Sequence, residues 1–147
     1  MEVKIVTTER ERELVYSIRK KVFVEEQHVP IEEEIDKHED EAIHFICYSD
    51  GKAVGASRLR IIDNYGKLER ICVLKEFRGQ SLGKQIIVKM EEIALKHGCN
   101  LTKLHAQTHA EQFYKHLGYT TVSDEFMDAG IPHVAMIKKL IHQSSAL

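Results

Sequence analysis

Residues 75–84 read Lys75-Glu76-Phe77-Arg78-Gly79-Gln80-Ser81-Leu82-Gly83-Lys84 and form a glycine-containing turn that opens into a predicted helix. Apolar residues then recur at helical spacing, which predicts a helix over about residues 81–97 that Gly98 closes. The first-turn N–H groups of a helix have no partner within the helix and lie at the positive end of its dipole. We therefore expect this turn to bind phosphate. A turn that only caps the helix is the alternative.

Two other phosphate-binding loops fit these residues less well. A Walker A loop has four residues between its glycines and a Ser or Thr after its Lys. Here three residues separate Gly79 from Gly83, and Gln85 follows Lys84. The Rossmann pattern GxGxxG is missing, and no acidic residue is placed to bind a ribose. A P-loop-like nucleotide-binding protein is therefore disfavoured.

The elements around the turn predict one domain of the α/β (α+β) class over residues 1–147. An antiparallel meander is expected over 42–74, because three strands there are joined by loops of hairpin length. Residues 25–41 are acidic and contain Pro30, so at most a short helix or turns are expected there. The expected strands cover residues 3–6, 42–48, 53–62, 67–74, 101–106, 119–123 and 133–140, and the expected helices cover 9–24, 81–97 and 110–117.

Composition excludes several classes of protein. With 21 Lys and Arg against 23 Asp and Glu, the chain has no basic excess, so no nucleic-acid partner is expected. No apolar run approaches the ~20 residues that span a bilayer, and no signal peptide begins the chain, so we expect no membrane partner and a cytoplasmic protein. Cys47, Cys72 and Cys99 form no CxxC pair; we expect small core residues and no metal site.

Two motifs resemble those of the GCN5-related N-acetyltransferase (GNAT) family. Residues 78–83 resemble motif A, which reads Arg or Gln, two residues, Gly, one residue, Gly or Ala; Ser81 stands in place of the usual middle Gly. Residues 113–119, Phe-Tyr-Lys-His-Leu-Gly-Tyr, resemble motif B and follow Ala106-Gln107. A further set of residues resembles the bacterial YjcF and ElaA-like branch: Arg19, residues 22–27, Asp36, Asp40, His44, Glu69-Arg70 and residues 130–133.

This resemblance implies a fold and a cofactor. The GNAT fold has a central mixed, mostly antiparallel sheet that is splayed between the fourth and fifth strands and flanked by helices. Acetyl-CoA lies in the resulting notch, without a metal. The resemblance implies that pantetheine runs along the backbone of residues 71–73 and that the pyrophosphate lies at the motif A turn. The implied cofactor-binding residues are Ile71, Cys72, Val73, Arg78, Gly79, Gln80, Ser81, Leu82, Gly83, Lys84, Gln107 and Tyr114.

Acetylation of an amine needs a neutral nucleophile and a way to protonate the departing thiolate. The resemblance assigns the acid to Tyr114; a half-buried aromatic residue on an amphipathic helix is the alternative. Glu69 is the candidate base, because strand alternation places it on one face with Ile71, toward the notch. A salt-bridge partner for Arg58, Arg60 or Arg70 is an equally common role for such a glutamate.

Glu25, Glu26, His44 and His133 are candidates for the amine-binding pocket, because they belong to the set that resembles the branch. A hydrogen-bonded structural role is the more common one for histidines such as His44 and His133. The acidic run of residues 32–41 is expected to be a solvated face, although it could also attract a cationic amine.

The sequence thus predicts an acetyl-CoA-dependent N-acetyltransferase acting on a primary amine of a small molecule or peptide. A CoA-binding sensor or structural module of the same fold is the main alternative, since a fold does not guarantee its usual chemistry. The acyl acceptor, the length of the acyl group and the oligomeric state stay open, and a homodimer is compatible with the sequence.

Overall fold

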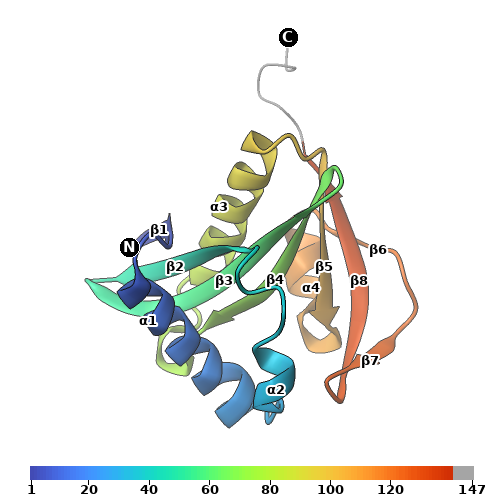
Figure 1. The fold of residues 1–147 in the computed structure, drawn as a ribbon. Coiled ribbons are helices and arrows are strands. Elements are labelled where there is room, and N and C mark those ends of the chain that lie inside the picture. The colour runs from blue at the N-terminus through green and yellow to red at the C-terminus, as the bar shows by residue number, and fades with distance from the viewer. Residues whose placement is uncertain (141–147) are drawn as a thin grey trace.

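The computed structural model describes residues 1–140 and shows a mixed sheet with helices on both faces (Figure 1). The strands follow the order β1-β2-β3-β4-β5-β8-β6, and β7 pairs with β8. The strands are β1 (Glu2–Ile5), β2 (Ile43–Ser49), β3 (Lys52–Ile62), β4 (Tyr65–Val73), β5 (Leu101–Gln107), β6 (Thr120–Thr121), β7 (Phe126–Asp128) and β8 (Ile131–Lys139). The helices are α1 (Glu9–Arg19), the π-helix η1 (Lys20–Glu26), α2 (Ile31–Glu34), α3 (Leu82–Lys96) and α4 (Glu111–His116), with 3₁₀ turns η2 (Lys75–Phe77) and η3 (Thr108–Ala110).

The sheet forks between β4 and β5. These strands are parallel, as the α3 crossover between them requires, and the other strand pairs are antiparallel. Only residues 65–68 of β4 pair with residues 101–104 of β5, after which the strands diverge (Figure 1). The expected splay between the fourth and fifth strands is therefore confirmed.

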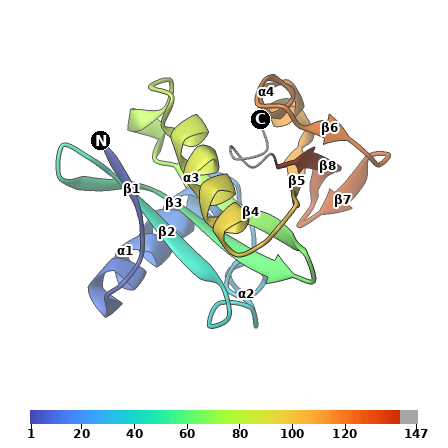
Figure 2. The ribbon, with the colours of Figure 1, turned by 90° about the horizontal axis from the view of Figure 1, so that it is seen from above.

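The helices α1 and α3 cover opposite faces of the sheet (Figure 2). The apolar stripe expected on the long helix is confirmed, because six of its residues are buried against the sheet: Leu82, Ile86, Ile87, Met90, Ile93 and Ala94. On the other face, α1 and η1 bury Val15, Ile18 and Val22 against Ile46, Ala56 and Cys72. All three cysteines are buried and free, as expected of small core residues.

Most expected boundaries agree with the structure to within two residues, and two segments differ. The helix expected over 9–24 changes to a π-helix after Arg19; the N–H of Gln27 donates to the carbonyl of Val22, five residues back. The strand expected over 119–123 shrinks to the two residues of β6, and β7 was not expected. The β7–β8 hairpin turns at Ala129 and Gly130, both at positive φ, without the Asn-Gly signature that marks such turns in a sequence.

A bulge interrupts β4 at Arg70, whose φ is +57°. Arg70 and Ile71 lie opposite the single residue Ser57 of β3, and the extra residue shifts the alternation of side chains. Ile71 packs with the apolar cluster under α3, whereas Glu69 pairs with Arg58 on the α1 side of the sheet. The expectation that Glu69 and Ile71 share a face is therefore wrong.

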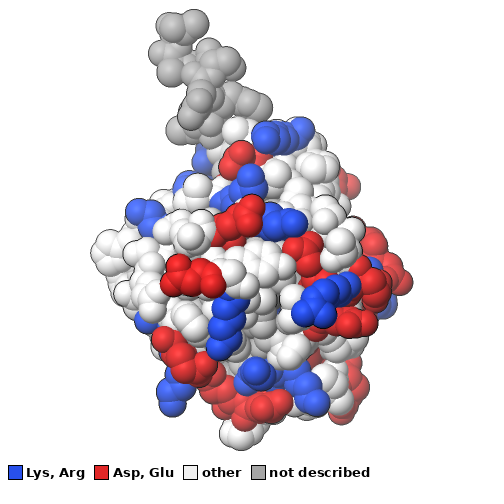
Figure 3. Space-filling view, turned by 90° about the vertical axis from the view of Figure 1, so that its left-hand side faces the viewer, with Lys and Arg blue, Asp and Glu red and all other residues white. Residues whose placement is uncertain are grey.

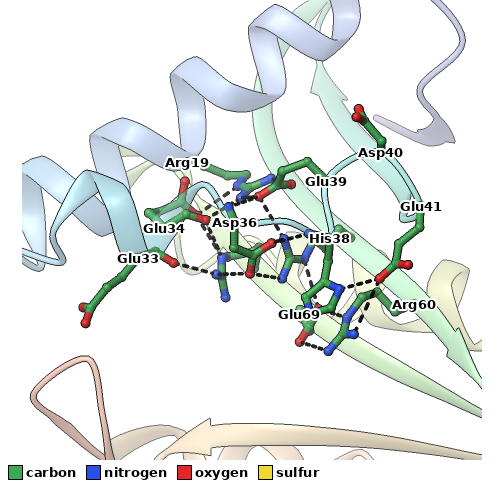
Figure 4. A network of polar contacts seen from close by, with 12 residues as sticks. Arg19, Glu33, Glu34, Asp36, His38, Glu39, Asp40, Glu41, Arg60 and Glu69 are labelled. Carbon is green, nitrogen blue, oxygen red and sulfur yellow. Dashed lines mark hydrogen bonds and ion pairs between the residues drawn. The ribbon is translucent and has the colours of Figure 1, made fainter.

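The acidic run of residues 32–41 is a solvated face only in part: Glu32, Glu33, Asp40 and Glu41 are exposed, whereas the rest of its carboxylates enter an ionic network (Figure 4). Glu34 and Glu39 are only 2% and 6% exposed. Arg19, which is fully buried, contacts both carboxylates at 3.0 and 2.8 Å. Arg58 extends the network from β3 to Glu39 and, at 2.7 Å, to Asp36. Arginine partners thus offset the cost of burying these carboxylates, and the acidity of the run alone did not predict their burial.

This network predicts a loss of stability in acid. Burial raises the pKa of Glu39, but the hydrogen bond and charge of Arg19 outweigh it and lower that pKa from 4.5 to about 2. The Arg58 guanidinium also holds the pKa of Asp36 well below its ordinary value. A depressed pKa in the folded state gives stability that is present above the unfolded pKa and is lost as pH falls toward the folded one.

We expect the free energy of unfolding to fall between about pH 4.5 and pH 2, with Glu39 alone contributing on the order of 2–3 kcal/mol. Urea unfolding of the parent and of Glu39→Gln at pH 7, 5 and 3 measures this effect. The variant should be less stable at pH 7 and show a flatter pH dependence. Parallel pH curves for the two proteins would contradict the assignment.

The outer surface carries charges of both signs. Figure 3 shows Lys and Arg side chains interspersed with Asp and Glu over the face it presents. No helix among residues 1–140 is long and apolar enough to cross a membrane.

Candidate active site

A cavity of about 850 Å³ lies in the fork of the sheet. One end is formed by the turn before α3, and its walls are β4, β5 and α4. The other end lies between η1 and α2 on one side and the β7–β8 hairpin on the other. A single cavity therefore joins the expected phosphate-binding turn to the opposite side of the sheet.

The turn before α3 presents unpaired backbone groups to the cavity. Ser81 is left-handed at φ +64°, and its side chain does not cap the helix. The first-turn N–H groups of α3 at Leu82, Gly83 and Lys84 therefore lack a cap of this kind and are free to bind an anion. Serine thus holds, at some cost in strain, the conformation that the usual glycine adopts freely. Gly79 also has positive φ, at +85°.

Two cations of the turn line the cavity, Arg78 and Lys84, and they differ in their surroundings. Arg78 donates from Nε to the carbonyl of Val73 at 2.9 Å and pairs through its Nη atoms with Glu26 on η1 at 2.7 and 2.8 Å. Lys84 lines the cavity and forms no ion pair with any residue in the described range 1–140. Gln80 is exposed and does not line the cavity. Lys84 is therefore the cation of this turn that is available to an incoming phosphate.

The β4 wall offers backbone groups to a ligand. Ile71, Cys72 and Val73 line the cavity beyond the last residue of β4 that pairs with β5, Leu68. Apart from the carbonyl of Val73, which accepts from Arg78 Nε, their β5-facing N–H and C=O groups have no strand partner there, so an extended amide-containing chain can bind to them. Gln107 closes the far wall and donates to Gln27, the residue that follows η1, at 2.8 Å.

Tyr114 lies on α4, and its ring lines the cavity. Phe113 and Tyr119 pack edge-on against it, with ring centroids at 5.2 and 5.9 Å. Burial raises the pKa of Tyr114 to about 12. Its hydroxyl therefore stays protonated at neutral pH and can act as a hydrogen-bond or proton donor, and the aromatic contacts also give it a packing role.

Glu69 lines the cavity but is tied into ion pairs. Its carboxylate contacts Arg58 at 3.0 Å, Arg60 at 2.8 Å and Lys67 at 3.3 Å. Burial raises its pKa, but the hydrogen bond of Arg60 and the charge of Arg58 prevail and lower it to about 2. A carboxylate with so low a pKa is a weak base. The geometry therefore favours the salt-bridge role, with Arg58 and Arg60 as partners, whereas Arg70 pairs with Glu34 and Asp36.

The four candidate amine-binding residues do not meet in one place. His133 and Glu26 line the cavity. Glu25 lies outside it, beside a smaller depression near Lys21. His44 is buried beneath α1, where its Nε2 contacts the carbonyl of Glu39 at 2.7 Å and its ring packs against Tyr16. The structure thus places His44 in the packing of α1 and away from the cavity.

Other cavity residues carried no signal in the sequence. His105 and Lys67 lie on strands at positions that alternate with buried residues, and Asp128 lies on the unexpected strand β7. Each lines the cavity only because the fork and the hairpin bring distant segments together. Within residues 1–140, no group of three or more His, Cys, Asp or Glu side chains is placed to hold a metal ion.

Comparisons with known proteins match this geometry. Residues 6–140 match the family model described as the acetyltransferase (GNAT) domain. The chain is 47% identical over 139 residues to the uncharacterized N-acetyltransferase YjcF of Bacillus subtilis, and this match covers 94% of this chain and 99% of YjcF.

Two crystal structures share the fold. Escherichia coli ElaA has a TM-score of 0.83 at 23% identity, covering 94% of this chain and 99% of ElaA. An aminoglycoside 6'-N-acetyltransferase complexed with coenzyme A has a TM-score of 0.78 at 15% identity, covering 97% and 99% of the two chains. The family model and the likeness to YjcF confirm the resemblance found in the sequence, and this chain belongs to the GNAT acetyltransferase family.

Proposed function

We propose that this protein transfers the acetyl group of acetyl-CoA to a primary amine of a small molecule or peptide. The observation that carries the proposal is the continuous cavity of about 850 Å³, which joins the expected phosphate-binding turn to the opposite side of the sheet. Membership of the GNAT family supports acetyl-CoA as the donor. The CoA complex of the aminoglycoside acetyltransferase, which has a similar fold, supports it further.

The residues that line the cavity fit CoA. The α3 start and Lys84 would hold the pyrophosphate, and the backbone groups of residues 71–73 that have no partner in the protein would hold the amide groups of pantetheine. When bound, acetyl-CoA supplies the thioester carbonyl that the amine attacks. The amine would enter the cavity at the end between α2 and the β7–β8 hairpin. Glu33 and Asp128 are exposed carboxylates at this end and can attract a cationic amine.

The test is thiol release from acetyl-CoA with a panel of amines: spermidine, tryptamine, L-lysine, glucosamine and a peptide with a free N-terminus. Amine-dependent release, with the acetylated product identified by mass spectrometry, supports the enzyme. Calorimetry with CoA and with ATP runs in parallel. Tight CoA binding without turnover of any amine would support the sensor or structural module instead.

We expect Tyr114→Phe to lower kcat by about 100-fold, because it removes the hydroxyl that we propose protonates the CoA thiolate. This factor is at the low end of the rate effects of general acid catalysis, because the conjugate base of a thiol with a pKa near ~8.5 leaves without much help. The ring keeps its contacts with Phe113 and Tyr119, so the Kd for acetyl-CoA and the Tm should change little. Unchanged kcat, with chemistry rate-limiting, would remove Tyr114 from the reaction. A large fall in Tm would support the packing role.

A further inference from the structure

His105 lies where the sheet begins to fork. The last pair between β4 and β5 joins Leu68 to Leu104, so His105 is the first residue of β5 beyond the paired segment. Its counterpart on β4 is Glu69, and both residues line the cavity. The His105 ring is thus in the narrow part of the fork, in the same cavity as Tyr114.

The ring nitrogens of His105 are free of protein partners. Three histidines line the cavity: His105, His109 and His133. The His109 Nε2 contacts Gln107 Oε1 at 2.7 Å, and the His133 Nδ1 contacts the carbonyl of Ile131 at 2.6 Å. Neither ring nitrogen of His105 forms a hydrogen bond with any residue in the part of the chain that the structure describes. This ring alone among the three therefore keeps both nitrogens for a ligand.

Aromatic contacts hold the His105 ring in place. The Phe126 ring of β7 packs edge-on against it at a centroid distance of 5.0 Å. Phe126 is itself stacked on His133 of β8 at 6.0 Å. A ring that is positioned by packing and not by hydrogen bonds can present a nitrogen to a substrate without first breaking a bond.

The charges around His105 favour its neutral form. Burial lowers its pKa, and so do Lys67 of β4, Lys103 of β5 and His133 of β8; Asp128 of β7 acts in the opposite direction. A neutral imidazole at pH 7 can accept a proton. Glu69, on the other side of the fork, has its charge balanced by three cations and is a far weaker base.

We propose that His105 accepts the proton of the attacking amine, a catalytic role that rests on the proposed function. The amine nitrogen forms a bond to the thioester carbonyl carbon, and the amine's proton goes to a ring nitrogen of His105. The carbon–sulfur bond breaks, and its electron pair leaves with the CoA sulfur, which takes a proton from Tyr114. His105 then loses its proton to solvent, and Tyr114 regains one.

The test compares His105→Gln with His97→Gln, a matched change at a histidine that caps the far end of α3, does not line the cavity and already contacts the carbonyl of Ile93. The substrate is the amine of the panel above that the parent acetylates fastest, and kcat is measured from pH 5 to 9. In the parent we expect kcat to fall on the acid side as a single group becomes protonated. His105→Gln should lose about 100-fold in kcat and lose this acid limb. His97→Gln should keep both, and all three proteins should bind CoA with Kd values within about threefold of one another.

A second readout does not depend on turnover. NMR titration of the histidine rings in the CoA-bound parent, with His105 assigned by its missing signal in His105→Gln, gives the pKa of this ring. If this pKa equals the pH at which kcat of the parent falls to half on the acid side, the proposal is supported. If the two values differ, the proposal is overturned. If His105→Gln turns over as fast as the parent, the role of His105 is overturned and the acetyltransferase is not. The same holds if His105→Gln no longer binds CoA or has a much lower Tm than the parent. A parent that acetylates no amine would overturn the acetyltransferase itself, and the role of His105 with it.

Discussion

Replacing Arg19 by methionine is expected to lower the free energy of unfolding by about 3–5 kcal/mol. The Arg19 side chain is fully buried and hydrogen bonds to Glu34, Glu39 and the main-chain carbonyl of Glu34. Methionine fills much of the same space but leaves two carboxylates buried without this partner, which costs more than the pair itself contributes. For a domain of this size the Tm should fall by roughly 10 °C or more.

Urea and thermal unfolding at pH 7 measure this effect. The matched control is Lys96→Met on α3, where the Lys96–Glu92 pair is exposed and worth at most a few tenths of a kcal/mol. A loss below about 1 kcal/mol for Arg19→Met would show that Arg58 and Arg70 compensate for the missing cation, and that the network does not depend on Arg19.

Gly79→Val is expected to weaken CoA binding by about 10-fold to 100-fold. A Cβ at this position meets nothing within 4 Å, so space is not the obstacle. The obstacle is the φ of +85°, which a β-branched residue adopts only at a cost of about 1–3 kcal/mol. The turn should escape that strain by changing conformation, and the N–H groups at the start of α3 would then no longer converge on the pyrophosphate.

Calorimetry with CoA tests this expectation, beside the Tm of each variant. Gly98→Val is the matched control, because Gly98 has a φ of +82° at the opposite end of α3 and does not line the cavity. It should cost stability but leave the Kd for CoA unchanged. Gly83→Val should also weaken binding, whereas Ser81→Gly should preserve it. If Gly79→Val and Gly83→Val fold and bind CoA as tightly as the parent, the pyrophosphate site lies elsewhere.

The parts of the fold that the sequence predicted are those that depend on local periodicity. The α3 stripe and the meander of β2, β3 and β4 have clear apolar patterns, so their positions agree with the structure. The turn before α3 was also predictable, because its residues are contiguous; its phosphate-binding role follows from the chemistry of a helix start and stays a prediction. The GNAT resemblance then supplied the fork, which no local pattern shows.

The rest depends on contacts between distant segments. The bulge at Arg70 reverses the alternation of side chains that had placed Glu69 and Ile71 on one face of the sheet. No residue type in this stretch of the sequence predicts such a bulge. Glu34 and Glu39 looked solvated because their arginine partners come from α1 and β3, far away in the sequence. His105 was overlooked for the same reason, since only the fork and the β7–β8 hairpin turn it into a cavity residue.

Under the proposed function, the β7–β8 hairpin is the natural target for changing acceptor selectivity by mutagenesis. The opposite wall, α2 and the loop that follows it, is bound to the sheet by buried arginines, so substitutions there endanger folding. Met127 is 64% exposed, and Asp128 is exposed at the cavity. Exposed positions of this kind usually change stability by less than about 0.5 kcal/mol. A library confined to this hairpin would therefore sample new acceptors while most of its members still fold.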